Sequence, residues 1–235
     1  MAVKAVFFDV GSTLLYPSPG VPETFTAAAC SRGHSVSLEE ARRYMPLADA
    51  HYDREYATNG DFWCSHDQAT AVWKDMYKIL ACELGLAHDA HGIAEDTHAQ
   101  YRRAHHWGVY EDVLPCLQGL KAAGLRLGII SNWDAELGLL IDELKLGHFF
   151  DAVFPSAAVG LRKPDPRIFE KALGEFGVSA EEAVHVGDLP EADGAAARVG
   201  IRPIIIDRKG LHSDCGFTTV SSLQNLVSEI NFQKS

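Results

Sequence analysis

The sequence predicts an α/β fold, a Rossmann-like core with a parallel sheet that carries an inserted all-α segment of four helices. Three observations predict it. An uninterrupted apolar run at residues 6–8 ends at Asp9, which is typical of a buried strand. Beyond residue 107, apolar runs alternate with helical patterns, as in βαβ units. Between these parts, residues 17–107 have helical spacing and little strand character.

The alternating part supplies the remaining strands and the helices of the core. Besides residues 6–8, the predicted strands are residues 125–130, 152–154, 183–186 and 203–206, which gives about five parallel strands. The helices predicted between them are residues 113–123, 136–144, 167–176 and 191–199. Three of these four helices stop at a glycine, the residue favoured just past a helix end. The tail from about residue 211 is expected to add a last edge strand and a short helix.

A proline-rich segment, with Pro17, Pro19, Gly20 and Pro22, opens the helical insert. The predicted helices of the insert are residues 23–32, 38–56, 66–84 and 93–106, with a turn at residues 59–61. We therefore expect a core of residues 1–16 and 108–235 and an insert of residues 17–107. An insert placed after the first strand is expected to act as a lid over the carboxyl ends of the strands.

Composition and charge narrow the class of protein. The 235 residues are 47% hydrophobic and 23% charged, an ordinary globular composition with room for a core and a smaller second domain. The formal net charge of -11 argues against a nucleic-acid or anionic-membrane partner. No apolar run approaches the roughly 20 residues of a membrane span. Five scattered cysteines without a CxxC pair, and nothing that resembles a signal peptide, predict a cytoplasmic location.

Polar residues that can carry chemistry follow two of the predicted strands. Asp9 ends the first strand, at the edge where open α/β sheets bind their ligands. An Asp in that place can be a nucleophile, a metal ligand or both. Ser131 and Asn132 follow the strand at residues 125–130 and can hold an anionic oxygen at the start of the next helix. An ordinary helix N-cap explains these two residues equally well.

Two further carboxylates and a lysine complete the set of candidates. Asp188 follows the strand at residues 183–186, and Asp193 lies near the start of the next helix. Carboxylates that converge on Asp9 would repel one another strongly unless a cation lies among them. Lys163, just before a proline, is one candidate cation, although a solvated surface lysine is the commoner explanation of any single Lys. Mg²⁺ is the other, since it binds carboxylates, backbone carbonyls and phosphate oxygens.

Together these residues resemble the four motifs of the haloacid dehalogenase-like hydrolase superfamily, in order and in spacing. The motifs are the run from Asp9 to Thr13, then Ser131, Lys163 and the segment from Gly187 to Asp193. The insert is similar to the four-helix cap that many members carry. The strings at residues 130–134 and 163–169 are similar to those of the haloacid dehalogenase-like hydrolase domain-containing branch.

The resemblance implies a hydrolase of phosphoric monoesters and gives three residues a catalytic role. Asp9 would attack phosphorus and form an aspartyl-phosphate, which water then hydrolyses. Ser131 would hydrogen-bond a transferring phosphoryl oxygen. Lys163 would neutralise charge on Asp9 and on the phosphoryl group. The substrate implied is a small phosphorylated metabolite, which Thr13 and Asn132 would contact together with Lys163.

The resemblance also implies a magnesium site. Asp9, the backbone carbonyl of Gly11 and Asp188 would hold Mg²⁺. Asp193 would steady Lys163 or a water on the metal.

One position departs from the pattern of the superfamily. Its phosphatases usually carry a second Asp two residues after the nucleophile, as general acid and base, whereas this chain has Gly11. Three interpretations stay open: a phosphatase that finds its acid and base elsewhere or acts on good leaving groups, a 2-haloacid dehalogenase, and a non-catalytic binding module. The insert holds eight of the 11 histidines, and His66 is the first candidate for a substitute acid or base. Asp188 favours a metal and hence a phosphate.

Overall fold

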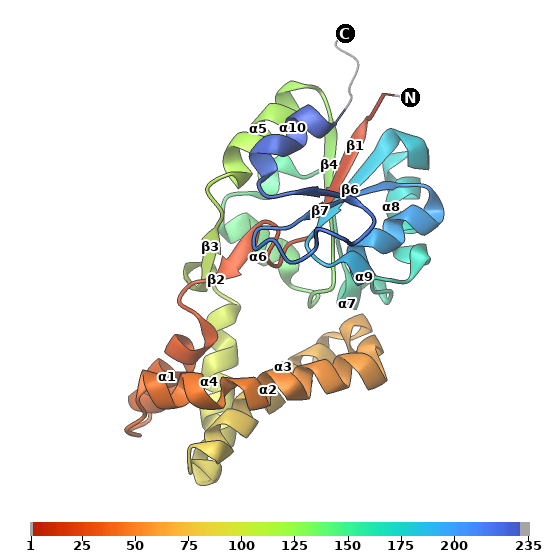
Figure 1. Cartoon of the computed structure of the whole chain (residues 1–235). Coiled ribbons are helices and arrows are strands. Elements are labelled where there is room, and N and C mark those ends of the chain that lie inside the picture. Colours follow the sequence, from red (N-terminus) through yellow and green to blue (C-terminus); the bar gives the residue numbers. More distant parts are fainter. Residues whose placement is uncertain (1, 231–235) are drawn as a thin grey trace. The chain divides into compact units, whose positions relative to one another are not determined.

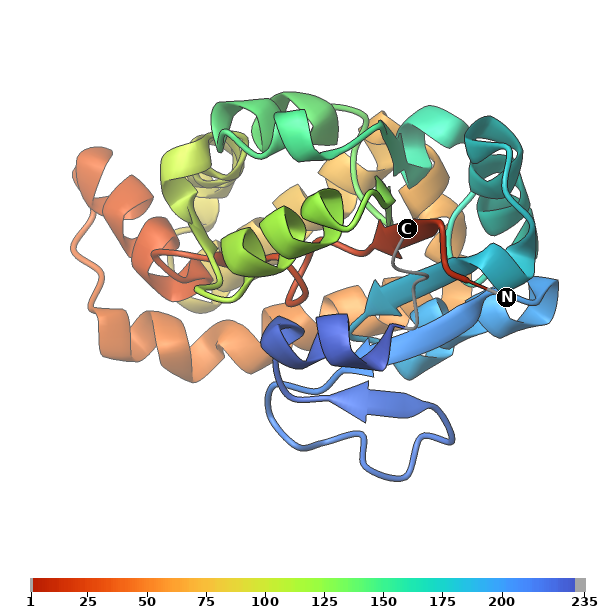
Figure 2. The same cartoon turned by 90° about the horizontal axis from the view of Figure 1, so that it is seen from above.

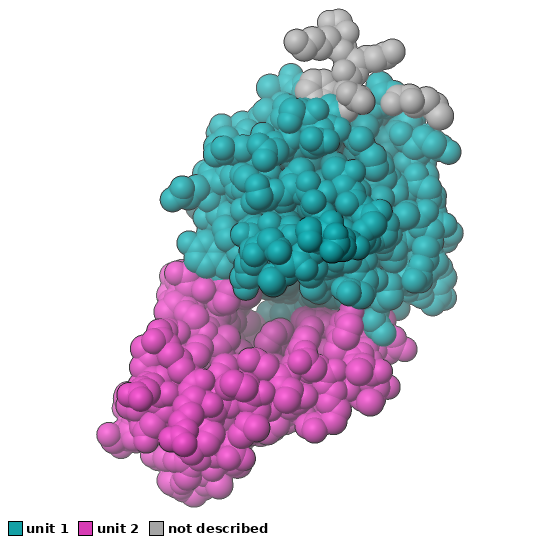
Figure 3. Space-filling model, in the orientation of Figure 1, with its two compact units in different colours: residues 1–16, 109–235 teal, residues 17–108 magenta. Residues whose placement is uncertain are grey.

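The computed structural model describes residues 2–230 and divides the chain into two compact units. The first unit comprises the residues up to Tyr16 and from Val109 onward, and the second comprises Pro17–Gly108 (Figure 3). Two short strands, β2 (Leu15–Pro17) and β3 (Trp107–Val109), pair with each other where the chain leaves and re-enters the first unit (Figure 1).

A six-stranded parallel sheet forms the centre of the first unit and confirms the predicted α/β fold class. Its strands are β1 (Ala5–Phe8), β4 (Arg126–Ser131), β5 (Ala152–Pro155), β6 (Ala183–Gly187), β7 (Arg202–Ile206) and β8 (Thr218–Val220). The order in the sheet is β5-β4-β1-β6-β7-β8. The chain therefore moves outward from β1 in one direction and later in the other. The point of reversal lies beside β1, and open α/β sheets bind ligands at the carboxyl edge of such a point.

Helices cover the sheet on two sides. The core helices are α5 (Val113–Ala122), α6 (Leu137–Glu143), α7 (Ser156–Val159), α8 (Pro166–Phe176), α9 (Pro190–Asp193) and α10 (Leu226–Glu229). Phe7 and Phe8 of β1 point to opposite faces of the sheet. Phe7 packs edge-on against Phe176 of α8, with ring centroids 4.7 Å apart. In Figure 2, α8 lies to one side of the strands, and α5 and α10 lie to the other.

The helix predicted at residues 191–199 is wrong in type. The chain forms only the short α9 there and continues as the 3₁₀-helix η6 (Gly194–Val199). Glycine disfavours the α-helix, and Gly194 also lets the ring of Phe217 pack directly against the backbone. The sheet has one strand more than the alternating part of the sequence predicts, because β8 from the tail joins it in parallel.

The second unit contains four helices: α1 (Val21–Ser31), α2 (Leu38–Asn59), α3 (His66–Glu83) and α4 (Ala90–Tyr101). Besides η6, the 3₁₀-helices among the described residues are η1 (Gly60–Cys64), η2 (Ala87–Asp89), η3 (Ala104–His106), η4 (Gly147–Phe149), η5 (Ala180–Glu182) and η7 (Leu223–Asn225). Helix α4 ends earlier than the sequence predicts, because the Trp107 indole N–H donates to the carbonyl of Tyr101 at 2.8 Å. Within residues 2–230, every helix is too short or too polar to cross a bilayer.

Candidate active site

Polar residues that follow β1 and its two neighbours meet at the carboxyl edge of the sheet. Phe8, the last residue of β1, lies opposite Ile129 of β4 and Val186 of β6, so Asp9 comes level with the ends of both strands. The N–H of Asp9 donates to the carbonyl of Val186 at 2.8 Å, which continues the parallel ladder by one bond. The side chain of Asp9 is therefore carried by a backbone that the central strands hold rigidly.

Two donors hold the carboxylate of Asp9. Ser131, the last residue of β4, donates its hydroxyl to Oδ1 at 2.9 Å, and Nζ of Lys163 donates to the same oxygen at 2.6 Å. Burial raises the pKa of Asp9, and the charge of Lys163 offsets part of that rise. The structure thus brings together the three residues to which the resemblance assigns catalysis.

Lys163 is a buried cation, with only 2% of its side chain exposed. Its Nζ lies 2.6 Å from Oδ1 of Asp9 and 2.5 Å from Oδ1 of Asp193. Burial alone would lower the pKa of Lys163, but the two carboxylates outweigh burial and raise the pKa above its ordinary value. Lys163 is therefore charged at neutral pH and bridges two acidic groups, in contrast to a solvated surface lysine.

Asn132 holds the backbone of Lys163. Its Oδ1 accepts the Lys163 N–H at 2.8 Å, and its Nδ2 donates to the Lys163 carbonyl at 2.9 Å. These two bonds fix the segment from which the ammonium group projects toward Asp9. In this geometry Asn132 acts on Lys163, and its contact with a substrate stays a prediction.

Asp193 is fully enclosed by donors. Besides Lys163, His185 donates from Nε2 to Oδ1 at 2.8 Å, and the Leu189 N–H donates to Oδ2 at 2.9 Å. Because a carboxylate only accepts, the proton of the neutral imidazole lies on Nε2, and Nδ1 of His185 has no hydrogen-bond partner in the described part of the chain. Burial works to raise the pKa of Asp193, but Lys163 and His185 outweigh it and hold the pKa well below its usual range. Asp193 is thus an ionised counter-charge for Lys163.

Gly187 leaves the space that the carboxylate of Asp193 occupies, since a β-carbon at residue 187 would overlap that carboxylate. Gly187→Ala is therefore expected to displace Asp193 from Lys163, to lower the free energy of unfolding by roughly 1–3 kcal/mol and to reduce hydrolysis. Gly174→Ala in α8 is the control, because a β-carbon there meets nothing within 4 Å. Urea unfolding compares the two variants, and a Gly187→Ala protein as stable and active as the wild type contradicts this account.

Asp9, Asp188 and Asp193 form an acidic cluster in which the ligating oxygens all lie within 4.8 Å of one another. Burial, with the charges of Asp9 and Asp193, raises the pKa of Asp188 to about 8. Lys163 supplies one positive charge against these three carboxylates. A divalent cation that prefers oxygen ligands fits the cluster, because it would relieve the repulsion that Lys163 leaves in place.

The turn after Asp9 carries Gly11 and Thr13. The Thr13 N–H donates to the carbonyl of Gly11 at 2.6 Å. The hydroxyl of Thr13 is buried and has no hydrogen-bond partner among residues 2–230, and its contact with a substrate stays a prediction. A β-carbon at Gly11 would lie 3.6 Å from Cζ3 of Trp133, which is ordinary van der Waals contact. The position that would carry an acid and base in many phosphatases is therefore bordered by an indole ring.

The sequence predicts a role as acid or base for His66 but no role for His185. His66 opens α3 in the second unit, and its Nδ1 is buried without a hydrogen-bond partner in the described chain. Its role as an acid or base stays a prediction. His185 lies outside the sequence motifs, although a histidine inside the apolar run at residues 183–186 indicates a buried polar contact.

A family model described as a haloacid dehalogenase-like hydrolase matches residues 3–200. The chain belongs to this family. The predicted hydrolase class and the resemblance to the superfamily are thereby confirmed. The chain is 30% identical over 194 residues to the human haloacid dehalogenase-like hydrolase domain-containing protein 3, which covers 80% of this chain and 75% of that protein.

A second relative has a more specific name. The chain is 31% identical over 229 residues to a glyceraldehyde 3-phosphate phosphatase from Methanopyrus kandleri, with 90% of this chain and 87% of that protein covered. Among solved structures, a 2-haloacid dehalogenase from Pseudomonas syringae shares the fold with a TM-score of 0.65 at 22% identity, over 96% of this chain and 97% of that one. The fold is thus common to phosphatases and dehalogenases, and the choice between them depends on the site.

Proposed function

We propose that the chain is a Mg²⁺-dependent phosphatase that hydrolyses a small phosphorylated metabolite through an aspartyl-phosphate on Asp9. The observation that carries this proposal is the buried series Asp9–Lys163–Asp193, with Asp188 in the same cluster of oxygens within 4.8 Å. A carboxylate nucleophile, a fixed cation beside it and surplus acidic ligands are the parts that phosphoryl transfer needs. The name of the Methanopyrus kandleri relative supports a phosphorylated substrate.

In the proposed reaction a carboxylate oxygen of Asp9 attacks phosphorus. A new phosphorus–oxygen bond forms while the bond to the leaving-group oxygen breaks, and that oxygen departs with the electron pair. Ser131 and Lys163, which both contact Oδ1 of Asp9, orient the carboxylate and offset negative charge on the phosphoryl group. Water then attacks the phosphorus of the aspartyl-phosphate, which releases phosphate and restores Asp9, and the proton that the water loses balances the departed alkoxide or phenoxide.

Asp9, the carbonyl of Gly11 and Asp188 would hold the Mg²⁺ ion, which when bound stabilises negative charge on phosphoryl oxygens. The fit rests on the charge of the site. Lys163 is one cation among three carboxylates, and the pKa of Asp188 is about 8. Without a second cation the negative charges of the site repel one another, and a divalent cation would offset them. Asp193 is engaged by Lys163 and His185, so we assign it to the positioning of Lys163.

A 2-haloacid dehalogenase is the second candidate, because a protein of that name shares the fold. Displacement of a halide requires a carboxylate nucleophile but no metal, and it leaves the third carboxylate, Asp188, without a use. A non-catalytic binding module has no use for the cluster at all. Since uncompensated buried charge is costly, both alternatives explain the cluster less well than the phosphatase does.

Removal of the metal provides a prediction on stability. Mg²⁺ at about 100 times its dissociation constant is expected to stabilise the folded protein by about 2.7 kcal/mol, and thus to raise the melting temperature. Asp188→Asn is expected to abolish most of this rise, whereas Asp214→Asn, at an exposed aspartate of the same unit, is expected to preserve it. Scanning calorimetry with Mg²⁺ and with EDTA checks both variants. An unchanged melting temperature of the wild type under the two conditions contradicts the proposed metal site.

The substrate class is tested with a panel of phosphate esters and 2-haloacids, each with and without Mg²⁺. The proposal expects phosphate release that depends on Mg²⁺ and no halide release. Halide release without a metal requirement establishes the dehalogenase instead. If a folded protein that binds Mg²⁺ releases neither phosphate nor halide from any compound, the binding module is favoured, and Gly11 in place of the acid and base explains the missing activity.

Three further predictions from the sequence concern matters outside this site. The insert is proposed to act as a lid that selects the substrate. The protein is proposed to work in the cytoplasm. Small molecules are proposed as its partners, in place of nucleic acid or membrane, on the strength of the net charge of -11.

A further inference from the structure

The turn after β1 is tight and bonded internally. The carbonyl of Val10 accepts the Leu14 N–H at 2.8 Å, and the carbonyl of Gly11 accepts the Thr13 N–H at 2.6 Å. Between them, Ser12 has a φ of 55°, in the left-handed region that residues with side chains rarely adopt. Such a backbone persists where its surroundings hold it. The turn that carries the proposed metal-binding carbonyl therefore needs an external support.

Arg208 provides that support. It lies in the segment after β7, far along the chain from the turn. Its Nη2 donates to the carbonyl of Thr13 at 2.8 Å, and its Nε donates to the carbonyl of Ser12 at 3.3 Å. Only 16% of the Arg208 side chain is exposed. The two carbonyls that point out of the turn thus end on one guanidinium group.

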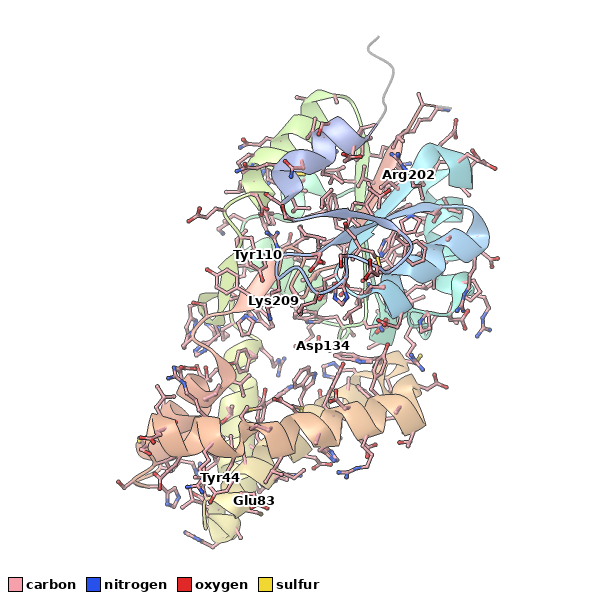
Figure 4. The ribbon with its side chains drawn as sticks, viewed as in Figure 1. Tyr44, Glu83, Tyr110, Asp134, Arg202 and Lys209 are labelled. Atoms are coloured by element: carbon pink, nitrogen blue, oxygen red, sulfur yellow. The ribbon has the colours of Figure 1, made fainter. Side chains whose placement is uncertain are left out.

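The guanidinium group is itself fixed in place. Nη1 and Nη2 donate to the two carboxylate oxygens of Asp112 at 2.9 and 3.0 Å. The group lies over the ring of Tyr110, 3.7 Å from the centroid; Figure 4 labels this tyrosine. Asp112 also accepts the hydroxyl of Ser222 at 2.7 Å and the Leu223 N–H at 2.9 Å. A bidentate, stacked arginine is a rigid group, so its contacts with the turn have defined directions.

Peptide planarity transmits this rigidity to the inside of the turn. In a planar trans peptide the N–H points opposite to the carbonyl. The Ser12 carbonyl belongs to the same peptide as the Thr13 N–H, which donates to Gly11. The Thr13 carbonyl belongs to the same peptide as the Leu14 N–H, which donates to the carbonyl of Val10. By holding the carbonyls of Ser12 and Thr13, Arg208 directs the Thr13 N–H to the carbonyl of Gly11 and the Leu14 N–H to the carbonyl of Val10. The bond from Thr13 holds the carbonyl of Gly11 in place.

We propose that Arg208 is a positioning residue for the hydrolase site: it holds the turn in the form that presents the Gly11 carbonyl to Mg²⁺. This inference rests on the proposed function. Arg208 acts through the backbone of the turn, with Asp112 and Tyr110 as its own support. Residues that orient metal ligands in this way typically change metal affinity by 10–100-fold when they are replaced.

The test measures Mg²⁺ binding by calorimetry, together with kcat and KM for an aryl phosphate. Arg208→Ala is expected to weaken Mg²⁺ binding by roughly 10–100-fold and to lower kcat more than it raises KM. Arg208→Lys keeps the charge but loses the fork, so it is expected to weaken binding as well with a smaller loss of stability. Guanidinium chloride at roughly 0.05 M, well below denaturing concentrations, is expected to restore part of the binding to Arg208→Ala relative to equal NaCl.

The matched control is Arg126→Ala. Arg126 also lies over an aromatic ring, that of Phe176 at 4.2 Å, and donates to the carbonyl of Phe176 at 2.7 Å. Arg126, however, is the first residue of β4, so it lies at the amino ends of the parallel strands, away from the site at their carboxyl ends. This variant is expected to bind Mg²⁺ like the wild type. If the wild type binds Mg²⁺ and folded Arg208→Ala and Arg208→Lys proteins bind it equally well, Arg208 has no positioning role. If the wild type itself neither binds Mg²⁺ nor releases phosphate, the proposed function is wrong, and the role of Arg208 that rests on it is wrong as well.

Discussion

Replacing Gly11 by Asp is expected to accelerate the hydrolysis of alkyl phosphates by about 10²–10⁴-fold, the usual contribution of a general acid and base. In the wild type, nothing at this position can protonate the leaving group. Values of kcat/KM, which report the step that expels the leaving group, are therefore expected to fall steeply as the pKa of the leaving group rises, with aryl phosphates much better than alkyl phosphates. In Gly11→Asp this dependence is expected to flatten. Measurements of kcat/KM for a series of phosphate esters check both expectations.

The structure has room for this substitution. Gly11 is not in a left-handed conformation, and the nearest heavy atom to a β-carbon there is Cζ3 of Trp133 at 3.6 Å. Gly11→Asn is the matched control, since it has the same size and cannot transfer a proton as a carboxyl group does. A folded Gly11→Asp protein that is no faster than Gly11→Asn means that another group already supplies the acid and base, or that the chemistry is not phosphoryl transfer.

Gly11 also predicts the time course of the wild-type reaction. With no base beside the aspartyl-phosphate, attack by water is expected to be the slower step. An aryl phosphate is then expected to give a burst of phenol followed by a slower steady rate, and the burst is expected to disappear in Gly11→Asp. Stopped-flow absorbance measures both enzymes. Linear phenol release by the wild type from the first turnover, with no covalent intermediate, argues against slow dephosphorylation.

Lys163→Met is expected to have the largest effect on stability. It removes the ammonium group that Asp9 and Asp193 contact and leaves both carboxylates buried without their cation. Breaking a buried ion pair from one side typically costs about 3–5 kcal/mol. Hydrolysis is expected to be lost as well, because Lys163 offsets the charge on the phosphoryl group in the proposed reaction.

The stability difference is measured by urea unfolding in EDTA, so that no metal compensates for the missing lysine. Lys121→Met is the control, since Lys121 pairs with Asp151 at 3.2 Å with 36% of its side chain exposed, and such pairs contribute only about 0–1 kcal/mol. If Lys163→Met were as stable as Lys121→Met, Lys163 would not be the counter-charge of the cluster.

The cost of Lys163→Met is also expected to depend on pH. In the wild type the pKa of Asp193 lies well below its usual range, so its contribution is present above an ordinary Asp pKa of about 3.9 and is lost as pH falls through the lower, folded value. Without Lys163, burial raises the pKa of the carboxylates, so the variant is favoured as pH falls and they take up protons. The stability difference between the two proteins is therefore expected to be largest near neutral pH and to shrink as pH falls: above about pH 4 because the variant takes up protons, and below it because the wild type loses the contribution of Asp193. A difference that stays constant across this range contradicts the buried ion pairs.

The fold was predictable where local pattern and tertiary packing agree. Buried parallel strands are apolar throughout, so β1, β4, β6 and β7 can be recognised in the sequence as apolar runs. Asp9 is conspicuous because it follows directly on the apolar run of β1. The end of α4 was not predictable. It depends on a bond from the Trp107 indole to the Tyr101 carbonyl, which helical periodicity does not report. Nor was η6, where Gly194 yields to the ring of Phe217 from a distant loop.

Within the site, residue types and motif spacing indicated the groups with chemical functions but not the contacts that support them. Asn132 is legible as a polar residue at a strand end, but its two bonds to the backbone of Lys163 require the fold. Arg208 leaves no signal at all, because an arginine after a strand is ordinary, and its partners at Ser12, Thr13 and Asp112 lie far away in the chain. Positioning groups of this kind become visible only when the backbone carbonyls are placed.

The most direct test of the central claim is a rapid-quench experiment with an aryl phosphate and Mg²⁺, followed by mass spectrometry of the segment that contains Asp9, for the wild type and for Asp9→Asn. We expect the wild type to carry a phosphoryl group on Asp9 in the first turnover and to release phosphate. We expect folded Asp9→Asn protein to do neither. Equal phosphate release by Asp9→Asn and the wild type, with no phosphoryl group on the segment, would contradict nucleophilic catalysis by Asp9.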